Sequence, residues 1–439
     1  MNKINRVLEK EFLFTLGDMK RLIVSFHSEM SNGLKGEASS LKMIPAYCAR
    51  PTGEEKGEYI ALDLGGTNFR VLALRLKGFG AVTSERVRKY AIDKRHMAGR
   101  GKCLFDFIAG SIKDFIETYN LNNKRRHDIG FTFSFPVFQQ GIAEGKLVRW
   151  TKGFKASGVE GQDVVKLLNK SLAGQGLVNT RVVAITNDTV GTLVSHSYKN
   201  TECDMGVILG TGTNACYPEK RANIIKLGTE RDARDEMIIN IEWGNYDKIN
   251  QTRYDELLDK GSTNYREQRL EKMVSGMYLG EIARLVLVDM IEKGVLHSVD
   301  NRLVDNPYSF HSKYMSVIEG DNTKNLIRVS HVMKDVGIDP AGFSDKRLVK
   351  KICRLISERA AKIAASAIIA VVTKMDPALK ERHIIAIDGS IFEKYFEFSD
   401  RIKKALRHYL KEKSAKIKLA LAKDGSGKGA CIVAAIAKS

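Results

Sequence analysis

Proline is scarce in this sequence, and so are long apolar runs. Only 7 of the 439 residues are proline, which argues against long disordered or proline-rich linkers. The longest largely apolar run, residues 363–372, is about half of what a membrane-spanning helix needs. The first residues, MNKINRVLEKEFL, lack the apolar core of a signal peptide. We therefore expect a globular protein that is cytoplasmic and does not attach to membranes.

Cysteines are few and widely spaced. No two of the six form a Cys-x-x-Cys pair, so we expect neither a zinc site nor a disulfide framework. A reducing compartment is the default expectation for such a chain. The six residues are Cys48, Cys103, Cys203, Cys216, Cys353 and Cys431.

Negative charge is in the minority. Lys and Arg number 71 against 52 Asp and Glu, a net charge of +19, which could attract nucleic acid, an anionic membrane or an anionic substrate. The basic residues are scattered, with only short clusters such as 124–126 and 403–404. No basic module interleaved with aromatic residues occurs. We therefore favour a basic surface that also attracts nucleotide phosphates, and we expect no nucleic-acid partner.

The chain is too long for one ordinary compact domain, so two or more lobes are expected. Apolar periodicity predicts both helices and strands, and a loop rich in Gly and Ser is expected at 31–40, before a first strand at Tyr59. The predicted helices cover 19–30, 104–115, 164–172 and 350–375, and the predicted strands cover 59–64, 69–76, 129–137 and 181–186.

One pattern occurs twice. Residues 59–71, YIALDLGGTNFRV, contain an apolar strand, a glycine-threonine turn, an asparagine and a second strand, and residues 205–217, MGVILGTGTNACY, repeat this pattern. Further glycine turns follow in 384–392 and 423–430. The simplest architecture is two related α/β lobes, each of which presents a phosphate-facing turn to a shared cleft.

The first turn combines a carboxylate with exposed backbone amides. In LDLGGTNFR, Asp63 precedes the glycine pair 65–66. Such amides can cradle phosphate oxygens while the carboxylate holds a magnesium ion through water. An ordinary hairpin turn is the alternative.

The glycine-rich turn 424–429 does not fit a P-loop. Gly429 stands where that motif needs Ser or Thr, and Ala422 stands where it needs its leading glycine. Phosphate binding by several separate glycine turns is instead typical of the superfamily that includes sugar kinases, heat-shock ATPases and actin.

The middle of the chain resembles one family in particular. The segments FTFSFPV (131–137), LVRWTKGFKASGVEGQDVV (147–165), TNDTVGTL (186–193), GTGTNACY (210–217) and IEWGN (241–245) occur in the order and spacing of eukaryotic-type hexokinases. SSLKMIPAY (39–47) and EKMVSGMYLGE (271–281) extend the match to the flanks. The chain therefore resembles a single-unit hexokinase along nearly its whole length.

The resemblance implies an α/β protein with the two-lobed, actin-like ATPase (ribonuclease H-like) fold and a ligand cleft between the lobes. The expected reaction is ATP-dependent phosphorylation of a hexose at its 6-hydroxyl. Glucose is the first expectation, with mannose, fructose and glucosamine left open, and the expected state is a monomer or homodimer. The implied divisions are an N-terminal helix and loop packed on the large lobe (1–56), a small lobe (57–186), a large lobe (187–426) and a C-terminal helix that returns to the small lobe (427–439).

A hexose carries no charge, so its recognition requires a ring of side-chain donors and acceptors. Taken alone, each candidate has an ordinary alternative: Ser134 could be a strand hydroxyl, Asn187 a turn former and Glu271 one charge on a helix face. The resemblance favours a joint role. The sugar ligands that it implies are Ser134, Thr151, Lys152, Asn187, Asp188, Asn214, Glu242, Gln268 and Glu271.

Asp188 is the predicted general base. It follows the apolar strand 181–186, so it should emerge at a strand end, where ligands bind to open α/β sheets. A carboxylate there can accept the proton of the sugar 6-hydroxyl. Lys152, the second predicted catalytic residue, is expected to hold the sugar and to stabilise charge on the transferred phosphoryl group.

The resemblance also implies contacts with ATP and magnesium. The Mg²⁺ ion would be held mainly by ATP oxygens and waters, with Asp63 nearby. The implied ATP-binding residues are Gly65, Gly66, Thr67, Asn68, Arg70, Thr211, Gly389, Gly425 and Ser426.

Two segments depart from the family pattern. Residues 264–267 could alter the rim of the sugar pocket, and either Asn322 or Thr323 could fill the expected nucleotide loop. Two other protein classes stay open. A non-catalytic sugar sensor is disfavoured because Asp188 and Lys152 are both retained. A filament-forming or chaperone ATPase of the same superfamily would need no FSFP, TKGF or EWG segment.

Overall fold

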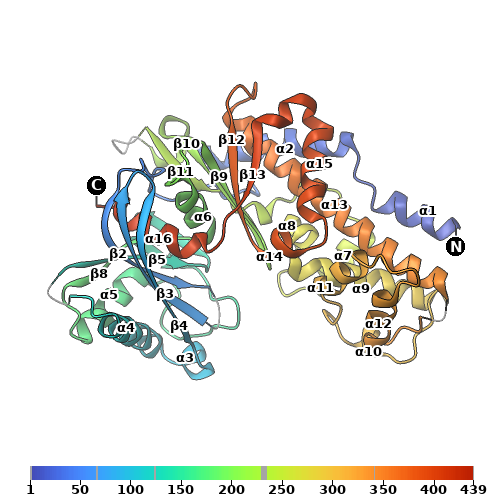
Figure 1. Ribbon diagram of the computed structural model, residues 1–439, viewed down its shortest axis with the longest axis horizontal. Coiled ribbons are helices and arrows are strands. Elements are labelled where there is room, and N and C mark those ends of the chain that lie inside the picture. The colour runs from blue at the N-terminus through green and yellow to red at the C-terminus, as the bar shows by residue number, and fades with distance from the viewer. Residues whose placement is uncertain (1, 66–67, 123–124, 229–234, 341, 439) are drawn as a thin grey trace.

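Two β-sheets organise the computed structural model, which describes residues 2–65, 68–122, 125–228, 235–340 and 342–438 (Figure 1). The strand orders are β4-β3-β2-β5-β8 in the first sheet and β1-β11-β10-β9-β12-β13 in the second. The first sheet contains β2 (Lys56–Leu64), β3 (Asn68–Gly78), β4 (Ala81–Ala91), β5 (His127–Phe133) and β8 (Thr180–Thr186). The second contains β1 (Ile44–Pro45), β9 (Cys203–Leu209), β10 (Thr213–Lys220), β11 (Glu236–Asn240), β12 (His383–Asp388) and β13 (Ile417–Leu421). A separate hairpin joins β6 (Val137–Gly141) and β7 (Glu144–Leu147).

The two sheets repeat one connectivity. In the first, β2, β3 and β4 are consecutive antiparallel strands, and β5 and β8 extend the sheet in parallel beyond β2. In the second, β9, β10 and β11 are consecutive antiparallel strands, and β12 and β13 extend the sheet in parallel beyond β9. The predicted repeat is therefore confirmed, because 59–71 and 205–217 supply equivalent strand pairs.

Helices α6 (Asp188–Ser197) and α16 (Gly425–Ile436) lie between the sheets (Figure 1). Helix α6 follows β8 but packs on β9 and β10, whereas α16 follows β13 but packs on β2 and β5. Glycines permit this close packing. A Cβ on Gly429 would lie 2.0 Å from the carbonyl oxygen of Gly191, and one on Gly130 would lie 1.8 Å from that of Ala430. Each helix thus links the sheet that it follows to the other sheet.

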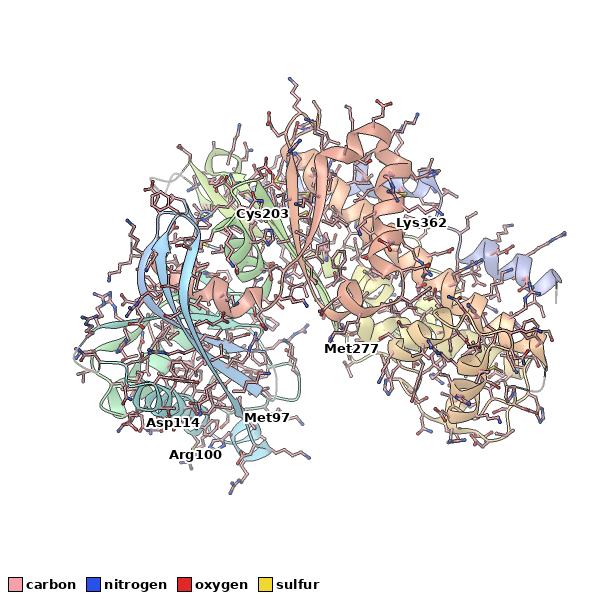
Figure 2. All side chains as sticks on the ribbon, viewed as in Figure 1. Met97, Arg100, Asp114, Cys203, Met277 and Lys362 are labelled. Carbon is pink, nitrogen blue, oxygen red and sulfur yellow. The ribbon has the colours of Figure 1, made fainter. Side chains whose placement is uncertain are left out.

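Further helices cover the outer face of the first sheet and build a helical region beside the second. Asp114 of α4 (Gly101–Thr118) and Cys203 at the start of β9 lie on opposite sides of the first sheet (Figure 2). The remaining α-helices are α1 (Asn2–Glu11), α2 (Leu16–Lys35), α3 (Lys94–Ala98), α5 (Val164–Gly174), α7 (Arg253–Gly261), α8 (Arg269–Val274), α9 (Gly276–Glu292), α10 (Arg302–Asp305), α11 (Ser312–Glu319), α12 (Ile327–Asp335), α13 (Phe343–Met375), α14 (Ser390–Lys394) and α15 (Phe398–Leu410). The 3₁₀ helices are η1 (Arg221–Asn223), η2 (Ile225–Leu227), η3 (Trp243–Asn245) and η4 (Lys411–Lys416).

The long helix α13 lies in the main apolar core, against α2 and α15. Its alanines Ala360, Ala361, Ala364 and Ala365 are buried, which agrees with the close packing predicted for them. Among the residues that the structure describes, none of the helices combines the length and the apolar character that a membrane crossing requires.

Several predicted boundaries were wrong. The loop expected at 31–40 begins later, because α2 continues to Lys35 with Leu34 buried, and Gly36 ends it at a φ of +81°. Strand pairing begins at β1, before the expected first strand, and the strand predicted at 129–137 ends at Phe133. Helix α13 begins before residue 350, where the Asp345 carboxylate accepts a hydrogen bond from the backbone amide of Gly342. The predicted lobe limits stay predictions.

Candidate active site

Charged residues that lie in or near both sheets come together in one cluster. Asp63 is near the end of β2, Asp188 directly follows the loop after β8, and Glu242 follows β11. Lys152 and Glu271 come from the loop before α5 and from α8. The pKa of Lys152 responds to the charges of all four carboxylates, and the pKa values of Asp188 and Glu271 respond to the charges of Lys152 and Glu242. The topology therefore gathers residues that are far apart in the sequence.

Asp188 is the first residue of α6, and its environment suits a base. The Asn187 side chain caps the helix by accepting a hydrogen bond from the Val190 amide at 2.9 Å. Burial raises the pKa of Asp188 from its usual range to about 6, although the nearby Lys152 ammonium opposes this shift. Repulsion from Glu242 adds to it. The carboxylate is therefore a stronger proton acceptor than an ordinary surface aspartate, while it is still ionised near neutral pH.

Lys152 is a loop residue with a left-handed backbone conformation, at a φ of +56°, and its side chain extends into this cluster. Its Nζ donates a hydrogen bond to the Ser134 carbonyl oxygen at 2.7 Å and lies 5.4 Å from the centre of the Phe135 ring. Loss of water around the ammonium lowers the pKa of Lys152, and nearby carboxylates, Asp188 foremost, oppose the change. The side chain thus places a positive charge beside the predicted base.

Glu242 is held in place by two amide side chains. Its Oε1 accepts hydrogen bonds from Asn214 Nδ2 at 2.9 Å and from Asn240 Nδ2 at 2.8 Å. Asn214 Nδ2 also lies 2.8 Å from Asn240 Oδ1. Sequence reasoning missed Asn240, which is the last residue of β11 and stands two positions before Glu242. A polar residue at the end of the apolar run MIIN was the signal that could have found it.

Glu271 faces the same cluster from α8. Its Oε2 accepts a hydrogen bond from the Thr213 backbone amide at 2.9 Å. Burial raises the pKa of Glu271 to about 7, the Thr213 hydrogen bond opposes the shift, and the charge of Glu242 adds to it. Gln268 is the N-cap residue of α8, with a φ of +56°, and its Oε1 would lie 2.4 Å from a Cβ on Gly244, within η3.

The structure also shows how the remaining predicted sugar ligands are placed. The Ser134 hydroxyl lies 3.7 Å from where a Cβ on Gly65 would stand, next to the first glycine turn. Thr151 directly precedes Lys152, and its carbonyl oxygen accepts a hydrogen bond from the Phe154 amide at 3.1 Å. These residues adjoin the charged cluster, although no contact among the described residues shows a role for the Thr151 hydroxyl.

A second polar group surrounds Asp63 and Arg70. Arg70 Nε lies 3.2 Å from Asp63 Oδ2, and its Nη1 lies 2.6 Å from Asp424 Oδ1. The Ser426 hydroxyl donates to Asp63 Oδ2 at 3.0 Å. The end of β2 and the start of β3 are therefore adjacent to the turn after β13. Asp424 was not predicted, although it lies in the glycine-rich turn that drew attention.

The glycine turns after β9 and β12 meet beside this group. A Cβ on Gly389 would lie 2.3 Å from the Leu209 carbonyl oxygen, and Gly389 has a φ of +125°, so the position requires glycine. The amides of Gly389 and Gly425 hydrogen-bond to the Asp388 carboxylate, although burial raises its pKa overall. Thr211, which follows Leu209 and Gly210, is exposed.

Other predicted nucleotide residues have less structural support. Gly66 and Thr67 lie outside the described residues, and Asn68 begins β3. The Thr323 hydroxyl donates to Asp321 Oδ1 at 2.6 Å and accepts from the Ile327 amide at 2.9 Å. Its hydroxyl therefore has a local structural role in starting α12.

The residues around Asp63 fit magnesium only through water. Asp63 Oδ2 is already engaged by Arg70 and Ser426. Within the described ranges, no group of three or more His, Cys, Asp or Glu side chains is arranged to hold a metal ion. A Mg²⁺ ion that arrives with nucleotide, and keeps several of its waters, is compatible with this donor set.

Comparison with known proteins identifies the family of this chain. Two family models, both described as hexokinase, match residues 4–198 and 204–436. The chain belongs to the hexokinase family. It is 41% identical to hexokinase-2 of Oryza sativa subsp. japonica over 98% of this chain and 90% of that protein. It is 40% identical to human hexokinase-3 over 93% of this chain, and the match spans 44% of that longer human protein.

A solved structure aligns with nearly the whole chain. The hexokinase from Schistosoma mansoni complexed with glucose aligns over 99% of each chain, with a TM-score of 0.86 and 34% identity. A second hexokinase crystal structure aligns over 99% of this chain with a TM-score of 0.87 and 30% identity. The predicted family and the predicted actin-like fold class are both confirmed.

Proposed function

We propose that the chain transfers the γ-phosphoryl group of MgATP to the 6-hydroxyl of glucose or a closely related hexose. The observation that carries this proposal is the environment of Asp188. Its carboxylate has a pKa raised to about 6, stands at a strand end next to a lysine ammonium, and is surrounded by side chains suited to an uncharged polyol.

The reaction needs one proton acceptor and one means of stabilising charge. As the 6-hydroxyl oxygen attacks the γ-phosphorus, its proton passes to the Asp188 carboxylate, the bond from phosphorus to the bridging oxygen breaks, and ADP leaves. Lys152, which is cationic and close to Asp188, stabilises the negative charge that moves through the phosphoryl group. When bound with ATP, Mg²⁺ neutralises charge on the phosphate oxygens.

Sugar recognition is assigned to the amides and carboxylates around this pair. Glu242 and Glu271 accept hydrogen bonds from ring hydroxyls, and Asn187, Asn214 and Gln268 supply amide groups that both donate and accept. Ser134 and Thr151 complete the ring from the other side. A hexose that satisfies all of these groups leaves no buried polar atom unpaired, which is the basis of selectivity at such a site.

Nucleotide binding is assigned to the glycine turns. The turns at Gly65, Gly389 and Gly425 present backbone amides to phosphate oxygens, which would replace the Asp388 carboxylate as partner of the Gly389 and Gly425 amides. Arg70 and Ser426 stand beside these turns. Asp63 would contact the magnesium shell through water. In the present arrangement Asp424 neutralises Arg70, so phosphate would replace this carboxylate as the partner of the guanidinium. The location we propose is the cytoplasm, and the proposed state is a monomer or homodimer.

A coupled assay tests the proposal and its rivals together. Release of ADP is measured with and without glucose, and the sugar product is identified by ³¹P and ¹³C NMR. A hexokinase releases ADP only with sugar and forms glucose 6-phosphate. A sugar sensor binds glucose without releasing ADP, whereas an ATPase of the same superfamily releases ADP without sugar. Mannose, fructose and glucosamine in parallel reactions define the range of substrates.

A further inference from the structure

An exposed ion pair joins the two parts of the chain that carry the proposed sugar ligands. Arg149 Nη2 lies 2.8 Å from Glu267 Oε2. Arg149 directly precedes the segment 150–152, which contains Thr151 and Lys152, and Glu267 directly precedes Gln268 at the N-terminus of α8. The two charged residues are 118 positions apart in the sequence, so no local element requires them to meet.

The backbone on the Arg149 side is fixed to the part of the molecule that contains the first sheet. The Val148 amide donates to the Pro136 carbonyl oxygen at 2.9 Å, and the Trp150 amide donates to Glu160 Oε1 at 2.7 Å. Both neighbours of Arg149 are therefore anchored. The position of the Arg149 side chain is therefore coupled to the position of the adjoining segment, and so to that of Lys152.

The backbone on the Glu267 side is equally well supported. Arg266 and Gln268 both have left-handed backbone conformations, with φ values of +65° and +56°. Residues other than glycine adopt this conformation only when the surrounding structure supports it. Asp259 Oδ1 accepts hydrogen bonds from the Arg266 amide at 3.0 Å and from Lys272 Nζ at 2.6 Å. The Lys272 side chain is 1% exposed and also donates to the Asn264 carbonyl oxygen at 2.8 Å.

These buried hydrogen bonds of Asp259 and Lys272 support residues 264–267, the segment whose sequence departs from the family pattern. They keep Glu267 pointed across to Arg149 while Gln268 stays at the start of α8. The hydrogen bond from Arg149 lowers the pKa of Glu267, so both partners are charged near neutral pH. The pair remains accessible to water, with 54% and 47% of the two side chains exposed.

We propose that Arg149 and Glu267 form a latch across the rim of the sugar site and act as positioning residues for sugar binding. This inference rests on the proposed function, because it assumes that a hexose contacts both sides. A sugar that does so binds best when the two sides are held together, and an ion pair between the two sides would stabilise that arrangement. Exposed ion pairs are weak, which suits a latch that must open again to release product.

Charge reversal provides the test. Arg149→Glu and Glu267→Arg each place like charges opposite one another, whereas the double variant restores an attractive pair in the opposite sense. Isothermal titration calorimetry with glucose alone gives the dissociation constant without any contribution from ATP. Each single variant should weaken glucose binding by about two- to fivefold, and the double variant should recover most of the loss. The differences should shrink in about 1 M salt, where the Debye length falls to about 3 Å.

Two further measurements make the result specific. Each single variant should raise KM for glucose with little change in kcat, since neither residue touches the reacting atoms. Lys102→Glu, which reverses one partner of the exposed Lys102–Asp106 pair within α4, should leave glucose affinity unchanged. The latch is overturned if the double variant binds glucose no better than the weaker single variant, or if the single variants bind as wild type does. A wild-type protein that neither binds nor phosphorylates hexoses would instead overturn the proposed function.

Discussion

Asn240 Nδ2 donates a hydrogen bond to Glu242 Oε1 over 2.8 Å, and this contact fixes the direction of a carboxylate proposed to bind sugar. Asn214 donates to the same oxygen, so the three side chains form a closed triangle. Glu242 has a left-handed backbone, with a φ of +56°. The two neighbouring amides hold its carboxylate in this position.

Asn240→Ala should therefore weaken glucose more than ATP. Removal of the amide takes away one of the two donors to Glu242 Oε1. The transition-state stabilisation measured by kcat/KM for glucose should therefore fall by about 1–3 kcal/mol. KM for ATP should change little. Steady-state kinetics in both substrates, together with the melting temperature of the variant, measure this. Equal losses for both substrates would show that the substitution damaged the fold and did not act through Glu242.

Asp188→Asn should remove the base and keep the shape of the site. The amide can still hydrogen-bond to a sugar hydroxyl, but it cannot take the proton, so kcat should fall on the order of 10²–10⁴-fold while glucose still binds. Calorimetry confirms that sugar binding survives. A folded variant within about threefold of wild-type kcat, which is less than about 1 kcal/mol of barrier, would exclude Asp188 as the base.

The dependence of kcat/KM on pH should show the titration of two carboxyl groups. Asp188, with a pKa of about 6, accepts a proton only when ionised, so kcat/KM should fall as the pH drops through 6. Glu271, with a pKa of about 7, should add a second limb, because its protonation removes an acceptor for a sugar hydroxyl. Glu271→Gln should eliminate the limb near 7 and leave the one near 6. A profile that stays flat down to pH 5 would contradict both assignments.

Much of the fold was readable from the sequence because it depends on local patterns. The two strand–turn–strand segments predicted the repeated sheets, and the apolar strand 181–186 predicted where Asp188 would emerge. Helix ends were less predictable, because capping residues set them and the apolar spacing does not. Gly36 ends α2 and Asp345 supports the start of α13, at positions that differ from those where the apolar spacing ends or begins. The first strand pair, β1 with β11, was missed because β1 has only two residues.

Parts of the site could not be predicted because they depend on partners that are distant in sequence. Asn240 is an unremarkable strand-end residue until Asn214 is brought beside it by the pairing of β10 with β11. Asp424 gains its role only because α16 returns to β2 and β3, where Arg70 lies. Arg149 and Glu267 meet only when both sheets are assembled. Spacing along the chain carries no information on such contacts.

The two tryptophans should report sugar binding from both sides of the site. Trp243 is fully buried, and its Nε1 donates to the Thr213 hydroxyl at 2.9 Å. The Thr213 amide donates in turn to Glu271. Trp150 is stacked on Phe154, with ring centres 5.3 Å apart, and stands two residues before Lys152. Both indoles are thus linked to proposed sugar ligands through one or two contacts.

Glucose alone, without ATP, should therefore change the intrinsic fluorescence saturably, with a midpoint near its dissociation constant from calorimetry. Trp150→Phe and Trp243→Phe should each remove part of the signal, because each indole reports a different side of the site. A sugar that contacts both sides should also favour the closed arrangement and reduce the radius of gyration in solution scattering. Closure excludes water, which otherwise competes with the 6-hydroxyl as phosphoryl acceptor. If saturating glucose leaves both the emission and the radius of gyration unchanged, sugar-driven closure does not occur in this protein.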